Sequence, residues 1–186
     1  MPTIERHMAD GRAVHVLDEA VSDADLLRAH TMCRMLPFTR IRYGYHAAAA
    51  DDLAFDYQWV HPVADDERAL LPLVTMAEAA ARCIDGDVQP GRVHINCITP
   101  GERRHRHIDG ARDRVYVAVL FANRAWDASW AGDLTFFADG QEALRIAPRP
   151  GRIVVFDGSI VHLGGVPTLD CPEVRYAIAH KFLRAA

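Results

Sequence analysis

Residues 114–122 read Arg-Val-Tyr-Val-Ala-Val-Leu-Phe-Ala, an almost continuous apolar run. A run of this length and composition predicts a strand that is buried on both faces. Turn sequences such as Ala138-Asp139-Gly140 and Asp157-Gly158 separate it from further short apolar segments. We therefore expect additional strands at residues 92–99, 132–137, 143–146, 152–156 and 174–183.

The first 91 residues have a different pattern, in which short strands alternate with helices. Ser22 followed by Asp23 and Asp25 is typical of a helix start, because the hydroxyl caps the first turn and acidic groups suit the helix dipole. This helix ends before Pro37. A broad apolar face predicts a second helix, and short strands precede and separate the two helices. The second helix is expected over 65–84, with a later start near Pro72 as an alternative. The strands are expected over 13–17, 39–46 and 55–60.

Two helices ahead of many short strands indicate an α+β fold that is mainly β. Strands spaced by such turns favour a sandwich or barrel, and we expect a double-stranded β-helix, the jelly-roll or cupin-like architecture. The N-terminal helices would pack on one of its sheets. With 186 residues the chain is interpreted as one domain, 1–186, with an N-terminal α/β support over 1–91 and a jelly-roll core over 92–186.

Composition narrows the range of partners. The formal net charge of -4 and the absence of a long basic run argue against a nucleic-acid partner. The cluster Arg103, Arg104 and Arg106 is interpreted as a solvated loop, with a substrate-facing basic rim as the alternative. No signal peptide or membrane span is recognised, so we expect a soluble, cytoplasmic protein whose oligomeric state stays open. Four scattered cysteines without a CxxC pair argue against a zinc ribbon or a disulfide scaffold: Cys33, Cys83, Cys97 and Cys171.

A metal site is indicated by His107-Ile108-Asp109 and, much later, His162. Residues two apart on an extended strand point to the same face, so His107 and Asp109 could reach one ion. Two imidazoles and one carboxylate form the facial triad of a non-haem Fe(II) centre with open coordination positions. His105 is a competing ligand on the same alternation, and His162, which precedes Gly164-Gly165, could instead be a buried core histidine.

An anchor for a carboxylate is indicated by Arg175, which opens an alternating strand. Arg175, Ala177, Ala179 and Lys181 would share one face of it. A guanidinium group holds a carboxylate by two parallel hydrogen bonds, as the distal end of a dicarboxylate requires. Lys181 is a rival anchor on that face, and an ordinary edge-strand role for Arg175 is the alternative.

These pieces together resemble the 2-oxoglutarate and Fe(II)-dependent dioxygenases of the prolyl-hydroxylase-like group. The resemblance covers about residues 92–183, whereas the first 90 residues match only in their order of strands and helices. It rests on the Pro100-Gly101 turn before His107-x-Asp109, the apolar strand ending in Asn123, Trp126-Asp127, residues 132–137 (GDLTFF), Pro150-Gly151-Arg152, His162 with its glycines, and Arg175-Tyr176-Ala177-Ile178.

The resemblance implies a jelly-roll enzyme in which His107, Asp109 and His162 hold Fe(II), and Arg175 pairs with the C5 carboxylate of the co-substrate 2-oxoglutarate, with Lys181 as backup. It also implies O2 as oxidant and succinate and CO2 as products. Several relatives use a tyrosine on the apolar strand to touch the co-substrate, and the counterpart here is Phe121, which lacks the hydroxyl. An intact Asp109 favours hydroxylation, or another oxidation such as desaturation, over halogenation.

The substrate is expected to be a small molecule, such as an amino acid or a biosynthetic intermediate. The alternatives are oxidation of a protein side chain, a cupin-like metal-dependent isomerase or hydrolase, and a module that binds a small acid. Relatives form their substrate wall from regions that correspond here to Asn96, His94, Arg40, Arg42 and Trp126.

Overall fold

The computed structural model describes residues 3–42, 57–112 and 114–184. Its strands form two antiparallel sheets, one large and one small. In spatial order the large sheet consists of β1 (Thr3–Ala9), β2 (Arg12–Asp18), β9 (Ile153–Asp157), β6 (Val115–Phe121), β11 (Arg175–Arg184), β5 (Val88–Ile98), β4 (Tyr57–Pro62) and β3 (Thr39–Arg42). The small sheet consists of β10 (His162–Gly164), β7 (Leu134–Ala138) and β8 (Gln141–Ile146).

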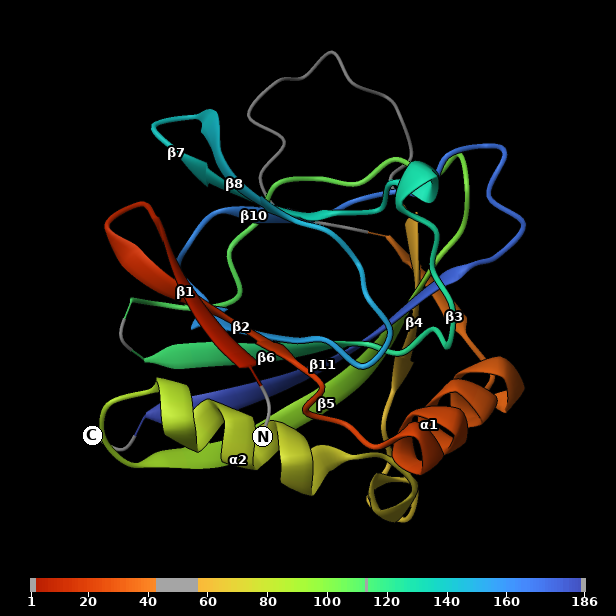
Figure 1. Ribbon diagram of the computed structural model, residues 1–186, viewed down its shortest axis with the longest axis horizontal. Coiled ribbons are helices and arrows are strands. Elements are labelled where there is room, and N and C mark those ends of the chain that lie inside the picture. Colours follow the sequence, from red (N-terminus) through yellow and green to blue (C-terminus); the bar gives the residue numbers. More distant parts are fainter. Residues whose placement is uncertain (1–2, 43–56, 113, 185–186) are drawn as a thin grey trace.

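The molecule has three layers (Figure 1). The helices α1 (Asp23–Met35) and α2 (Leu73–Cys83) lie on one side of the large sheet, and the small sheet lies on the other side. This is the mainly β, jelly-roll architecture with helices on one sheet that the sequence predicts.

Each interlayer space has its own hydrophobic core. The helices bury side chains such as Met76 and Cys33 against Ile95 and Ile178 of the large sheet. On the opposite face, side chains of the large and small sheets meet, with Phe136 packed edge-to-face on Phe156 at a centroid distance of 4.9 Å. The strands β6, β9 and β11 contribute apolar side chains to both cores, as the run at residues 114–122 predicts for β6.

The first helix follows its sequence signals. Ser22 is the N-cap, and its hydroxyl accepts a hydrogen bond of 3.1 Å from the backbone N–H of Asp25. The second helix begins later than residue 65, because Pro72 takes the N-cap position and only a short 3-10 turn, Arg68–Leu70, precedes it. The later of the two expected starts is therefore confirmed. Among the described residues, no helix is long and apolar enough to cross a membrane.

Two strands are missing from the sequence predictions. β1 has mostly exposed side chains and no apolar alternation, so nothing in its sequence marks it as a strand. β10 has only three residues. The expected strand over 39–46 is confirmed as far as Arg42, and its remainder lies outside the described residues.

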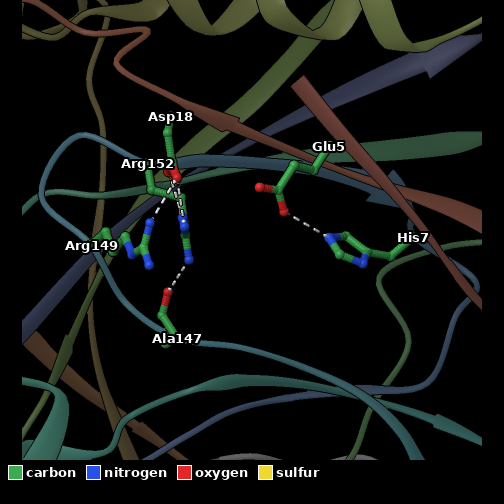
Figure 2. Close-up of polar contacts among 6 residues, drawn as sticks. All are labelled: Glu5, His7, Asp18, Ala147, Arg149 and Arg152. Atoms are coloured by element: carbon green, nitrogen blue, oxygen red, sulfur yellow. Dashed lines mark hydrogen bonds and ion pairs between the residues drawn. The ribbon is translucent and has the colours of Figure 1, made fainter. Parts of the chain in front are cut away.

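A part-buried ion pair ties β2 to the β8–β9 connection (Figure 2). Arg152 forms two hydrogen bonds of 2.6 Å to the two carboxylate oxygens of Asp18 and a third, of 2.9 Å, to the carbonyl of Ala147. Arg149 donates to the same carboxylate at 3.2 Å. Hydrogen bonds from Arg152, and the charges of both arginines, lower the pKa of Asp18 although its partial burial opposes this. The paired strand β2 is thereby held beside β9.

Candidate metal and co-substrate site

The site lies between the two sheets, where the segment after β5 crosses to β10. His107 and His162 form an isolated antiparallel bridge, with N–H···O distances of 3.0 and 2.9 Å. Two residues further on, the N–H of Asp109 donates to the carbonyl of Gly158 at 2.6 Å. These backbone hydrogen bonds hold the His-x-Asp segment in register with β10, so that three side chains distant in sequence converge.

The donor atoms of His107, Asp109 and His162 all lie within 4.8 Å of one another. Each histidine contacts the carbonyl oxygen two residues before it through Nδ1, at 3.0 Å to His105 and 2.9 Å to Ile160. A carbonyl only accepts, so Nδ1 carries the proton and Nε2 keeps its lone pair for a ligand. Burial, and next the neighbouring His162, lower the pKa of His107 to about 4, which keeps its imidazole neutral near pH 7.

Asp109 has its carboxylate oxygens in two different environments. Oδ1 accepts a hydrogen bond of 2.6 Å from Nζ of Lys181, which also contacts the backbone carbonyl of Asp109 at 3.2 Å. Oδ2 lies 3.5 Å from Nε2 of His162. Burial by itself would raise the pKa of Asp109, but the polar contact with His162 and the hydrogen bond and charge of Lys181 lower it well below its usual range. The carboxylate is therefore charged, with Oδ2 on the side of the histidines.

Arg175 lies at the start of β11 and is only 2% exposed. Its guanidinium carbon is 4.9 Å from the ring centroid of Phe121, and it forms no hydrogen bond or ion pair with any other described residue. Burial, and next the charge of Arg104, lower its pKa to about 9. A buried cation without an anion is costly, so this arrangement fits a bound carboxylate.

One pocket of about 1070 Å³ contains both groups. The facing side of β11 forms one wall, with Arg175, Ala177, Ala179 and Lys181 in the alternation that the sequence predicts. Three apolar side chains also line this pocket. They are Ile98, Val119 and Leu134. The pocket therefore joins a metal-binding cluster to a buried cation through a partly apolar interior.

Comparison with known families assigns this site. The model of the 2OG-Fe(II) oxygenase superfamily matches residues 93–182, which contain all three residues of the cluster and Arg175. Over this segment the chain is a 2OG-Fe(II) oxygenase. The family implies Fe(II) as the metal, 2-oxoglutarate as co-substrate and O2 as oxidant. The residues present fit this set, because two imidazoles and a carboxylate suit ferrous iron and Arg175 suits the dicarboxylate.

Solved structures share the fold of this oxygenase. An oxidoreductase of the 2OG-Fe(II) oxygenase family from Burkholderia pseudomallei superposes with a TM-score of 0.69 and 16% identity, covering 92% of this chain and 85% of that chain. A Trichoplax adhaerens prolyl hydroxylase in complex with a peptide fragment of hypoxia inducible factor gives 0.65 and 15%, covering 91% and 83%. HygX from Streptomyces hygroscopicus, with nickel and 2-oxoglutarate bound, gives 0.67 and 7%, covering 92% and 83%. A comparison with curated protein sequences finds no match.

Other expected site residues of the oxygenase are only partly brought together. His94 and Asn96 line the pocket, and burial lowers the pKa of His94 to about 4. Arg40 is exposed on β3 and outside the pocket lining, whereas its neighbour Ile41 belongs to it. The side chain of Arg42 lies outside the described part of the chain.

Trp126 also lies outside the pocket lining. Its indole N–H donates to the carbonyl of Ala131 at 2.9 Å, and its ring packs edge-to-face on Trp130 at 5.5 Å. These contacts give Trp126 a packing role in the loop before β7. The competing ligand His105 is exposed and does not belong to the metal-binding cluster.

Two features of the oxygenase site escape the sequence analysis. Lys181 pairs with Asp109, 72 positions away, so its ammonium group is directed at the metal-binding cluster. The side chain of Arg104 is only 6% exposed and lines the pocket, so the solvated-loop interpretation is wrong for this residue. Its neighbours Arg103 and Arg106 are exposed, and no sequence pattern separates the three arginines.

Proposed function

We propose that this oxygenase hydroxylates an unactivated C–H bond of a small molecule, such as an amino acid or a biosynthetic intermediate. In this proposal His107, Asp109 and His162 hold Fe(II), and Arg175 holds the distal carboxylate of 2-oxoglutarate. The observation that carries it is the convergence of three donor side chains within 4.8 Å of one another in a pocket that also contains a buried guanidinium with no ion-pair partner among the described residues. Bound iron, with 2-oxoglutarate and O2, supplies the oxidising power for C–H cleavage, and the co-substrate leaves as succinate and CO2.

The chain's own residues orient the participants. The two backbone carbonyls that accept from Nδ1 of His107 and His162 fix each ring with Nε2 toward the cluster. Lys181 occupies Oδ1 of Asp109 and leaves Oδ2 to bind the metal. Because Asp109 is present as a charged carboxylate, it would occupy a metal position that a halogenating enzyme leaves open for chloride. Hydroxylation is therefore favoured over halogenation.

A small substrate is supported by the size of the pocket and by the relatives. The volume of about 1070 Å³ has room for 2-oxoglutarate and a second small molecule. Fold relatives include an α-ketoglutarate-dependent epimerase from nogalamycin biosynthesis, at 10% identity. The peptide complex of the Trichoplax enzyme is the contrasting case, so a protein side chain is the second candidate.

Anaerobic titration tests the proposed cofactor set. Fe(II) and 2-oxoglutarate together should give a weak visible charge-transfer band, because a ferrous ion held by His107, Asp109 and His162 would have positions left for the co-substrate. Asp109→Ala and His162→Ala should abolish the band, whereas His105→Ala should retain it because His105 is not in the cluster. Absence of both the band and succinate formation in the wild type would refute the proposal.

Substrate-stimulated succinate formation tests the substrate class. A panel of free amino acids and a panel of peptides are compared under turnover conditions with Fe(II), 2-oxoglutarate and O2. Stimulation by a free amino acid, with a product that is heavier by one oxygen atom, is the expected result. Stimulation by peptides alone would replace the small-molecule proposal with the side-chain alternative.

A further inference from the structure

Arg104 is a second buried guanidinium in the pocket. It belongs to the segment between β5 and His107, and its side chain is 6% exposed. Glu102 is 10% exposed and lies 3.8 Å from Arg104. The other carboxylate oxygen of Glu102 accepts hydrogen bonds from the N–H and hydroxyl of Thr99, at 2.9 and 2.7 Å. Glu102 is thus fixed by Thr99 and lies within ion-pair distance of Arg104.

Arg104 and Arg175 approach the same point of the small sheet. A methyl group built on Gly164 of β10 would lie 3.8 Å from Nη1 of Arg175 and 3.9 Å from Nη2 of Arg104. The two nitrogens are thus no farther apart than the sum of these distances. A single carboxylate that accepts hydrogen bonds from both sides can span that separation. Gly164 has no side chain, so it adds no atoms beside the two guanidinium groups.

The charged residues around Gly164 can accommodate one further anion. Glu102 compensates Arg104, whereas Arg175 has no ion-pair partner among the described residues. Asp133 acts on Arg175 only at longer range and lies 3.6 Å from Arg145. The aromatic ring beside Arg175 belongs to Phe121, which has no polar group to offer a ligand. One added carboxylate would balance the charge of Arg175 and would lie within reach of the Arg104 guanidinium.

We propose that Arg104 is a second anchor for the C5 carboxylate of 2-oxoglutarate, acting together with Arg175. This inference rests on the proposed function, because it assigns a further residue to the same co-substrate site. The residue then sets selectivity for a dicarboxylate over a 2-oxo acid whose distal end is apolar.

The test compares two 2-oxo acids that differ at the distal end. Binding of 2-oxoglutarate and of 2-oxopentanoate to the Ni(II)-loaded protein is measured by calorimetry, without turnover. A hydrogen bond to a charged group has a strength that corresponds to about ten- to a hundredfold in affinity. We therefore expect Arg104→Met to weaken 2-oxoglutarate by about that factor and 2-oxopentanoate by less than about threefold. Arg103→Met is the matched control, because Arg103 is the exposed neighbour, and it should bind both acids like the wild type.

Two results with Arg104→Met would overturn the inference. Equal weakening of both acids would give Arg104 a general structural role, and unchanged binding of both would remove it from the co-substrate site. If Arg104→Met does not fold, Arg104→Lys keeps the charge but not the planar fork, and it should lose affinity for 2-oxoglutarate selectively. A wild type that binds neither acid would instead refute the proposed function, while selective binding that survives both variants would refute only the role of Arg104.

Discussion

Replacing Arg175 with methionine should stabilise the ligand-free protein while it removes co-substrate binding. Arg175 is 2% exposed and has no ion-pair partner among the described residues, so the fold without ligand contains a buried, uncompensated charge. Burial, and next the charge of Arg104, lower the pKa of Arg175 from its ordinary value to about 9. A change of one pKa unit corresponds to about 1.4 kcal/mol, so keeping this group charged at neutral pH costs roughly 5 kcal/mol.

The net gain is smaller than this electrostatic cost. Methionine would recover part of the apolar packing on Phe121, but it would lose the contact between the guanidinium and the ring, at 4.9 Å. Replacement of a buried ion pair by well-packed apolar residues is often neutral or stabilises a protein by about 1–4 kcal/mol, and a buried charge without a partner is costlier still. We expect Arg175→Met to raise the free energy of unfolding by about 1–3 kcal/mol in the absence of ligand.

Urea unfolding with and without ligand measures both effects. The wild type with Ni(II) should gain about 2.7 kcal/mol when 2-oxoglutarate is present at a hundred times its Kd. Arg175→Met should gain almost nothing under the same conditions. Arg184→Met is the matched control, because Arg184 is exposed on the same strand, and it should retain the full ligand effect. A variant Arg175→Met that is less stable without ligand and still stabilised by 2-oxoglutarate would refute the reasoning.

Three further predictions concern the stability of the ligand-free fold. Burial holds the pKa of His94, His107 and His180 at about 4, whereas histidines in the unfolded chain titrate near 6.5. The free energy of unfolding should therefore be constant above about pH 6.5 and fall between about pH 6.5 and 4, by up to about 1.4 kcal/mol per pH unit for each histidine. Urea midpoints that are equal at pH 7 and pH 5 would contradict this. His180→Leu should raise the free energy of unfolding by about 1 kcal/mol and flatten that pH dependence, because both ring nitrogens of His180 are buried without a hydrogen-bond partner in the described structure. Asp18→Asn should lower it by about 2 kcal/mol, because Arg152 loses its charged partner; an unchanged thermal midpoint would show that the pair contributes nothing.

Local signals in the sequence were sufficient for much of the fold. The Ser22 cap, the terminating Pro37 and the apolar run at 114–122 each act through neighbouring residues, so the corresponding helix and strand are confirmed. β1 could not be found in this way, because its side chains are mostly exposed and only pairing with β2 makes it a strand. The start of α2 was open for a similar reason, since periodicity alone did not decide between Asp65 and Pro72.

The sequence by itself determined the chemistry that the site could support. The spacing of His107 and Asp109, the glycines after His162 and the alternation that begins at Arg175 predict a metal cluster and an anion anchor, because these relations are local to single strands. Only the tertiary structure decided that Lys181 holds Asp109 and that Arg104 turns inward beside Arg175. Both contacts join segments brought together by sheet pairing, and charge compensation inside a pocket depends on distances in space that the order of residues along the chain does not specify.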